Sequence, residues 1–192
     1  SVVTVNTNNI VQPLTFGIWI PYFWVSEAWP DYVRRARDLN DTPRAQRQAH
    51  CLTGPLLAMP AAELIAAWLV PLAATAAAGW TGRGPLAVVA ICDCNPTVHA
   101  LNKATSPNPH MNGLLDAARA FTHQWLGVHV PRDANKDADA LTHPRDIERR
   151  IHNMVGPNLT PIRAHPPDDA WHRLWELMSS ESWLRTAPEQ LL

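Results

Sequence analysis

The feature that most constrains the fold is an uninterrupted apolar stretch, residues 86–92, which is followed at once by Asp93. An apolar run of this length is typical of a central strand that is covered on both faces. A second strand is expected at residues 126–130, and a polar segment that contains Asp139 follows it. Acidic residues therefore follow two consecutive strands, which is how a sheet brings carboxylates from distant parts of a chain to one place.

The other predicted elements complete an α/β fold, a mixed sheet with helices around it. Short apolar segments bounded by turn residues predict three antiparallel strands: 2–5, 16–22 and 23–29. Apolar residues at helical spacing predict helices at 61–78, 95–103 and 111–125. Pro71 is expected to kink the first of these helices or to end its first part. The polar segment 31–60 is either a helix with an exposed face or a long loop inserted between strand and helix.

Composition narrows the class of protein. The chain has 192 residues and a net charge of −1, so its overall charge does not indicate a polyanion partner. No run of about 18 apolar residues occurs, which argues against a membrane span. Three cysteines form no even framework and predict a reducing, intracellular compartment, cytoplasm or nucleus. The chain starts in a strand-like run without Met or a signal peptide, which predicts a domain taken from a longer protein.

Glu63 is the only acidic residue in the alanine-rich segment 61–78. Burying an unpaired carboxylate is costly, so this side chain must reach solvent, a basic partner or a metal ion. A position in the first turn of a helix would also favour an acid through the helix dipole. Both interpretations stay open on the sequence pattern alone.

Several motifs of the second half of the chain belong together. They are residues 93–103 (DCNPTVHALNK), Ser106, residues 112–115 (NGLL), and a terminal block of His129, Val130, Pro131, Asn135 and residues 138–141 (ADAL). This pattern resembles the ribonuclease H domain of retroelement reverse transcriptases, in particular those of DIRS-like and related fungal retrotransposons. The resemblance implies a ribonuclease H-like mixed five-stranded sheet flanked by helices over residues 1–143. Residues 31–60 would be an insertion, and residues 144–192 a C-terminal helical extension.

The resemblance also implies a site that acts on an RNA–DNA hybrid within a reverse transcriptase polyprotein. Glu63, Asp93 and Asp139 would bind Mg²⁺ or Mn²⁺, because hard divalent cations prefer carboxylate oxygens. His129 would assist proton movement or product release, although a histidine on a loop often has no such task. The residues implied as nucleic-acid contacts are Asn95, Asn102, Lys103, Ser106 and Asn135.

One position departs from the family pattern. Where the family carries an aspartate at the end of its first strand, this chain has Asn6, with Asn8 as a less favoured alignment. An amide has the shape of a carboxylate but no charge, so metal affinity is expected to fall sharply. Both a natural loss of the acid and a deliberate substitution that traps substrate would leave an asparagine here. The chain as written is predicted to cleave poorly or not at all.

Three functional classes follow from these observations. The first is a metal-dependent nuclease that cleaves the RNA strand of hybrids, and the second is a non-catalytic platform of the same fold that binds nucleic acid or protein. A transposase or integrase is less well supported, because the block from His129 to residues 138–141 does not fit it. The tryptophan-containing segment 170–184 predicts an amphipathic helix, whose aromatic stripe is more often buried than bound to nucleic acid.

Overall fold

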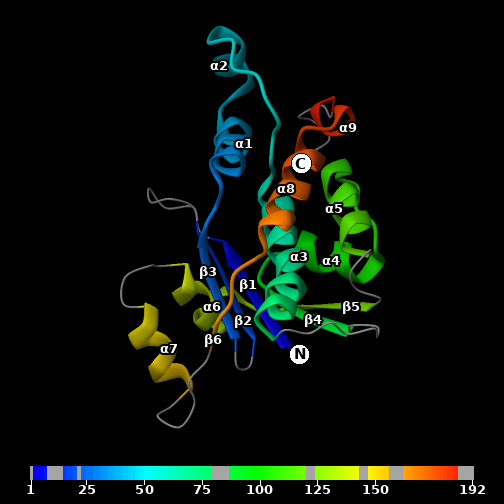
Figure 1. Cartoon of the computed structure of the whole chain (residues 1–192). Coiled ribbons are helices and arrows are strands. Elements are labelled where there is room, and N and C mark those ends of the chain that lie inside the picture. Colours follow the sequence, from blue (N-terminus) through cyan, green and yellow to red (C-terminus); the bar gives the residue numbers. More distant parts are fainter. Residues whose placement is uncertain are drawn as a thin grey trace.

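The computed structural model describes residues 2–7, 15–20, 23–78, 87–119, 124–142, 147–155 and 162–185. Within them the strands form one sheet in the order β5-β4-β1-β2-β3-β6, with helices on both of its faces (Figure 1). The strands are β1 (Val2–Thr7), β2 (Thr15–Ile20), β3 (Phe23–Ala28), β4 (Ala87–Cys92), β5 (Gln124–His129) and β6 (Ile162–Arg163). The chain is thus an α/β protein, as the sequence predicts.

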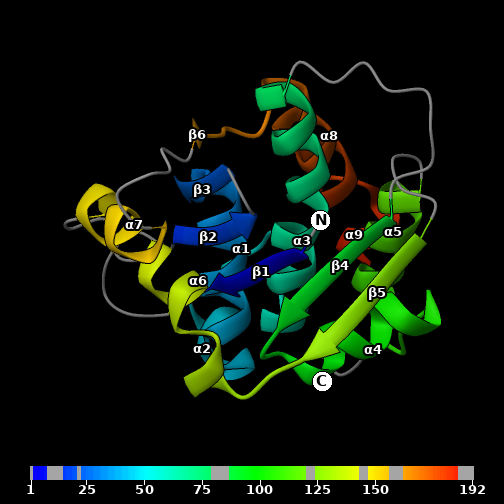
Figure 2. The ribbon, with the colours of Figure 1, turned by 90° about the horizontal axis from the view of Figure 1, so that it is seen from below.

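The sheet is mixed in direction. β1, β2 and β3 pair antiparallel in sequence, whereas β4 and β5 run parallel to β1. Figure 2 shows β1, β4 and β5 pointing the same way, so that their carboxyl ends share one edge. The predicted count of five strands is corrected to six, because β6 pairs in parallel with β3 at the other side of the sheet.

One face of the sheet carries the main hydrophobic core. Four helices lie on it: α3 (Met59–Ala78), α4 (Asn95–Lys103), α5 (Pro109–Arg119) and α8 (Asp168–Met178). α3 packs against β1 and β2, and α4 packs against β4 and β5. The buried cluster joins Val25 and Ala90 of the sheet to Leu64 of α3 and Leu174 of α8. Burial of this apolar surface is the dominant force that holds the layers together.

The opposite face carries α6 (Lys136–Leu141) and α7 (Ile147–Val155), and α6 packs against β1 and β2. Trp24, Leu141 and Ile151 form a second, smaller cluster here. Neighbouring residues of a strand face opposite sides, so Val25 enters the main core while Trp24 enters this one. The Ser26 hydroxyl donates a hydrogen bond of 2.6 Å to the Leu141 carbonyl and ties α6 to β3.

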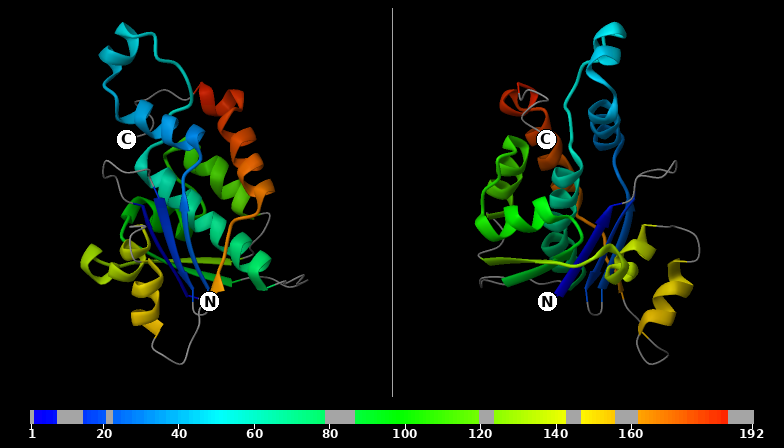
Figure 3. Two further views of the ribbon diagram at one scale, coloured as in Figure 1. Left: turned by 60° about the vertical axis from the view of Figure 1, so that its left-hand side comes forward. Right: turned by 180° about the vertical axis from the view of Figure 1, so that it is seen from behind.

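Residues 31–60 hold two helices, α1 (Asp31–Asp41) and α2 (Arg44–Ala49), which extend beyond the end of the sheet (Figure 3). Of the two predicted alternatives, a helix and a long loop, the helix describes most of residues 31–49, although it is divided into two. Val33 and Ala36 of α1 enter the main core, but α2 buries no residue.

Three further details differ from the sequence prediction. α3 continues through Pro71, so the proline does not end it. The helix expected at 111–125 is α5, which ends at Arg119, and Gln124 already lies in β5. The single helix expected at 170–184 is two, α8 and α9 (Glu181–Leu184). Among the described residues, no helix has the length and apolar character needed to cross a membrane.

Candidate active site

The carboxyl edge of β1, β4 and β5 collects the predicted site. Val5 of β1 pairs with Cys92 of β4, and Cys92 pairs with His129 of β5. Asn6 is the next residue of β1, and Asp93 directly follows the end of β4. The backbones of Asn6 and Asp93 therefore lie at the same carboxyl edge of the sheet, and the role of Asn6 in a site there stays a prediction.

Glu63 reaches this edge from the helical layer. It is buried, with 3% of its surface exposed, and its Oε2 atom lies 4.0 Å from Cys92 Sγ. α3 begins at Met59 and has no acid in its first turn, so Glu63 lies deeper in the helix than the sequence suggested. The helix dipole acts mainly within the first turn and does not account for this acid.

Asp93 and Asp139 are linked through Asn135. The Nδ2 atom of Asn135 donates a long hydrogen bond of 3.5 Å to Asp93 Oδ1. The Asn135 carbonyl accepts a hydrogen bond of 3.0 Å from the Asp139 backbone N–H, which starts α6. Asn135 itself is buried, whereas Asp93 and Asp139 are half-buried. The buried amide thus fixes the start of α6 against the end of β4.

Burial and the nearby carboxylates both raise the pKa values of two cysteine thiols at this edge. Burial raises the pKa of the Cys92 thiol well above its usual range, and the Glu63 carboxylate raises it further. The pKa of Cys94 is also raised, by burial first and then by Glu63 and Asp93, while hydrogen bonds with Thr97 oppose the shift. Both thiols stay protonated at neutral pH. Glu63 and Asp93 therefore act on the same small region, although they come from different elements.

His129 and Arg132 complete the edge. His129 is the last residue of β5 and is exposed. Arg132 begins the turn η1 (Arg132–Ala134), and its Nη2 atom lies 3.9 Å from Asp139 Oδ1. The sequence prediction did not include Arg132. The available signal was its position within the block His129-Val130-Pro131, directly before the acidic helix.

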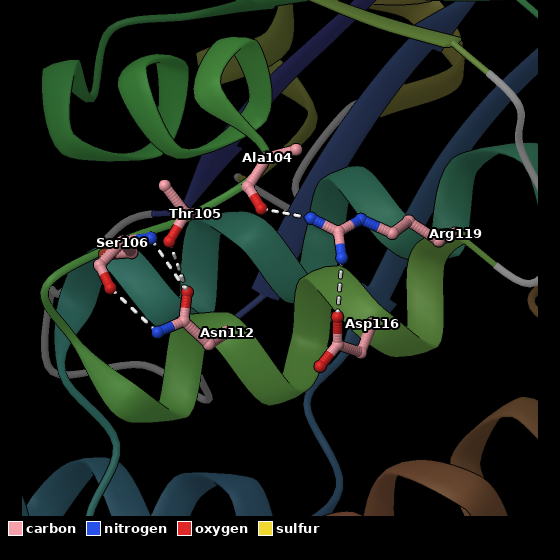
Figure 4. Close-up of polar contacts among 6 residues, drawn as sticks. All are labelled: Ala104, Thr105, Ser106, Asn112, Asp116 and Arg119. Carbon is pink, nitrogen blue, oxygen red and sulfur yellow. Dashed lines mark hydrogen bonds and ion pairs between the residues drawn. The ribbon is translucent and has the colours of Figure 1, made fainter.

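Four of the five predicted nucleic-acid contacts lie in α4 or just after it, and the fifth, Asn135, follows η1 and is buried. Asn95 is exposed at the start of α4, close to Asp93, whereas Lys103 is exposed at its end. The Asn102 amide is used inside the protein, because it exchanges hydrogen bonds of 2.9 and 2.7 Å with the Gly127 backbone. Ser106 follows α4 and exchanges backbone hydrogen bonds with the Asn112 amide (Figure 4).

The structure tests whether these side chains fit a divalent cation. Carboxylate oxygens are suitable ligands, and three come from separate elements: α3, the end of β4, and α6. Among the described residues, however, no three His, Cys, Asp or Glu side chains are close enough together to hold a metal ion. The side chain of Asn6 lies outside the described set. The carboxylate donors therefore suit a divalent cation, but the described side chains lie too far apart to surround one.

Comparison of the chain with models of known families gives no match, and comparison with curated proteins gives none either. Among solved structures, the chain is similar to RNase H1 from the halophilic archaeon Halobacterium salinarum NRC-1. The identity is 16% and the TM-score 0.46, and the similarity covers 76% of this chain and 95% of the archaeal one. Because a similarity this low carries no functional information, function has to come from the residues of this chain.

Proposed function

We propose that this chain is the ribonuclease H-like domain of a retroelement reverse transcriptase, a type of domain that cleaves the RNA strand of RNA–DNA hybrids, and that Asn6 leaves the chain as written weakly active or inactive. The observation that carries the proposal is the convergence at the carboxyl edge. Glu63 lies beside Cys92, Asp93 accepts from Asn135, and Asp139 follows one turn later. Asp93 and Asp139 belong to the motifs that carry the family resemblance, and the resemblance implies Glu63 as their partner. The three acids come from distant positions of the chain, and their assignment to one metal site is part of the proposal.

The proposed cofactor is Mg²⁺ or Mn²⁺, with Glu63, Asp93 and Asp139 as the residues that would hold it. When bound, divalent cations supply an activated water and stabilise the leaving oxygen in phosphodiester hydrolysis. The chain's own contribution is to orient the carboxylates. Asn135 is buried and donates to Asp93, which limits the rotation of that carboxylate. Exposed His129 would assist proton movement or product release, as the family resemblance implies.

Hybrid recognition would depend on shape. Proteins read A-form-like duplexes mainly through the backbone and the 2′-hydroxyls rather than the bases. Asn95 is the predicted contact best placed for this, because it is exposed and lies two residues after Asp93. Lys103 lies at the other end of α4, about 12 Å along the helix, and would contact a more distant part of the duplex.

A non-catalytic platform is the second candidate function, and two observations favour it. Asn6 stands where the family carries an aspartate, and the described side chains form no group of three metal ligands. In this case the same edge would bind nucleic acid or a protein partner without cutting. The two functions make opposite predictions for the Asn6→Asp variant.

The decisive experiment measures cleavage of an RNA–DNA hybrid labelled on its RNA strand, with Mg²⁺ and with Mn²⁺. The nuclease hypothesis predicts little or no cleavage by the chain as written and clear cleavage by Asn6→Asp. The gain should be at least the roughly 10- to 100-fold that losing a supporting residue around a metal costs.

The matched control is the double variant Asn6→Asp/Asp93→Asn, which restores one acid and removes another. It should lose the activity that the single variant gains, and this result excludes a contaminating nuclease. If Asn6→Asp binds the hybrid but still does not cleave it with either metal, the nuclease hypothesis is wrong and the platform is favoured.

A further inference from the structure

The segment between β5 and α6 is fixed at both ends to the end of β4. The Val130 N–H donates a hydrogen bond of 3.1 Å to the Cys92 carbonyl. Five residues later, the Asn135 amide donates to Asp93. Between these points the chain makes the tight turn η1, in which the Asn135 N–H donates to the Arg132 carbonyl at 3.0 Å. Arg132 therefore begins a turn with a defined position relative to Asp93.

The guanidinium of Arg132 points into solvent beside the acidic edge. Its side chain is 65% exposed, and the Asp139 carboxylate, at 3.9 Å, is itself 31% exposed. An ion pair at this distance between exposed groups is only weakly attractive in water. The contact with Asp139 places Arg132 beside the acidic edge, and the Arg132 side chain stays 65% exposed to solvent.

A positively charged side chain at this edge would favour the approach of a nucleic-acid strand, in addition to any bound divalent cation. The partly exposed Asp93 and Asp139 present negative charge there, and they repel the phosphates of an incoming strand. A guanidinium offsets this repulsion locally. Its planar array of N–H donors also matches two phosphate oxygens at once, which a lysine does not achieve.

Other arginines of the molecule have different surroundings. Arg37 is buried and bonds to the Leu57 carbonyl and to Asp41, so it supports the α1 arm. Arg119 pairs with Asp116 and also donates to the Ala104 carbonyl (Figure 4). It ends α5, shortly before the start of β5, and therefore lies toward the opposite edge of the sheet.

We propose that Arg132 is a phosphate-binding residue that positions the nucleic-acid strand beside Asp93 and Asp139. This proposal rests on the proposed function, because it takes nucleic acid as the ligand of the carboxyl edge. It goes further by assigning strand positioning to a residue that the sequence motifs did not identify. Since phosphate contacts position a duplex without reading its sequence, the contribution of Arg132 should be independent of base composition.

The test is fluorescence anisotropy of a labelled RNA–DNA hybrid with the full chain, as written at Asn6, over a series of salt concentrations. Arg132→Ala should weaken binding by roughly three- to tenfold, and the slope of log affinity against log salt should fall in magnitude by about one. Arg132→Lys keeps the charge but not the paired donors, so it should recover the slope and only part of the affinity.

Arg119→Ala is the matched control, since it removes an exposed arginine from the opposite edge. It should leave both affinity and salt slope unchanged. If Arg132→Ala melts below the parent protein, Arg132→Gln serves as the second variant, because it keeps most of the side chain and removes only the charge.

Three results would overturn the proposal. One is an Arg132→Ala variant that binds the hybrid as tightly as the parent. Another is a loss no larger than that of Arg119→Ala. The third is unchanged hybrid binding together with tighter Mg²⁺ binding, which would make Arg132 a counter-ion of Asp139 rather than a phosphate ligand. Failure of the parent chain to bind any hybrid would instead contradict the proposed function, so the two failures can be told apart.

Discussion

At the scale of single residues, His110 shows how burial sets the behaviour of a titratable group. It is 2% exposed, its ring stacks on Trp183 at 4.0 Å, and its Nε2 atom lies 3.0 Å from the Trp183 carbonyl. Burial lowers the pKa of His110, and the hydrogen bond to the Trp183 carbonyl only partly opposes the shift. His110 therefore stays neutral in the folded protein at pH values where the unfolded chain is protonated.

This pKa difference predicts a pH dependence of stability. As pH falls below about 6.5, the unfolded chain takes up a proton that folded His110 does not, so the free energy of unfolding decreases. We expect the melting temperature to fall between about pH 6.5 and 5. His110→Gln keeps a hydrogen-bond donor for the Trp183 carbonyl but does not titrate, so its melting temperature should fall less over the same range. Parallel pH profiles of the two proteins would show that His110 does not contribute.

The sequence predicted which residues belong to the candidate site better than it predicted what each side chain binds. Asp93 and Glu63 could be singled out because acids stand out next to an apolar strand or inside an apolar helix, whereas Asp139 was assigned from the family resemblance. Asn102 belongs to the same family motif, yet its amide bonds to the backbone of Gly127. The sequence does not show which partner an amide finds, because that depends on a neighbouring strand 25 residues away.

At the scale of elements, the contact between α4 and β5 sets one wall of the site. β5 approaches α4 closely at Gly127, where an added Cβ atom would lie 2.9 Å from the Val98 carbonyl oxygen and 3.1 Å from Val98 Cα. Asn102 closes the same contact with its two backbone hydrogen bonds. Because His129 follows Gly127 by two residues, this packing also positions the end of β5.

Gly127→Ala should therefore push β5 away from α4. We expect a loss of about 1–3 kcal/mol in the free energy of unfolding, as for other overpacked positions, measured by urea denaturation. Gly113→Ala is the matched control, because its Cβ atom would meet only Leu177 Cδ1 at 3.4 Å, an ordinary contact. This helical position should lose nothing and gain up to about 1 kcal/mol from higher helix propensity. Equal destabilisation by both substitutions would contradict the close approach at Gly127.

The elements that the sequence predicted well are those with a long apolar pattern. α3 was found from its spacing, and of the two expectations for Pro71 the end of the helix was wrong, since the helix continues to Ala78. A kink at Pro71 stays a prediction. β6 was missed because two residues, Ile162 and Arg163, carry no periodic signal. Its place in the sheet comes from pairing with β3, a contact between segments far apart in the chain.

At the scale of the whole molecule, the C-terminal segment is built into the same core as the sheet. β6 extends the sheet, and α8 contributes Ala170, Leu174 and Met178 to the main cluster. The Tyr32 hydroxyl donates to the Trp171 carbonyl at 2.9 Å, and Trp183 Nε1 donates to the Leu56 carbonyl at 3.0 Å. The boundary after residue 143 stays a prediction, but these contacts indicate that the described parts unfold together.

Leu174→Ala tests this cooperativity, because Leu174 is fully buried between α8 and the rest of the core. We expect it to cost roughly 2–5 kcal/mol and to lower the stability of the whole protein. Urea unfolding followed by tryptophan fluorescence and by far-UV circular dichroism should give one shared transition at a lower midpoint. Leu184→Ala, at a position that is 51% exposed, should change the free energy of unfolding by less than about 0.5 kcal/mol. If Leu174→Ala instead splits the unfolding into two transitions, the C-terminal segment detaches by itself, because its contacts with the core are then too weak to couple the two parts.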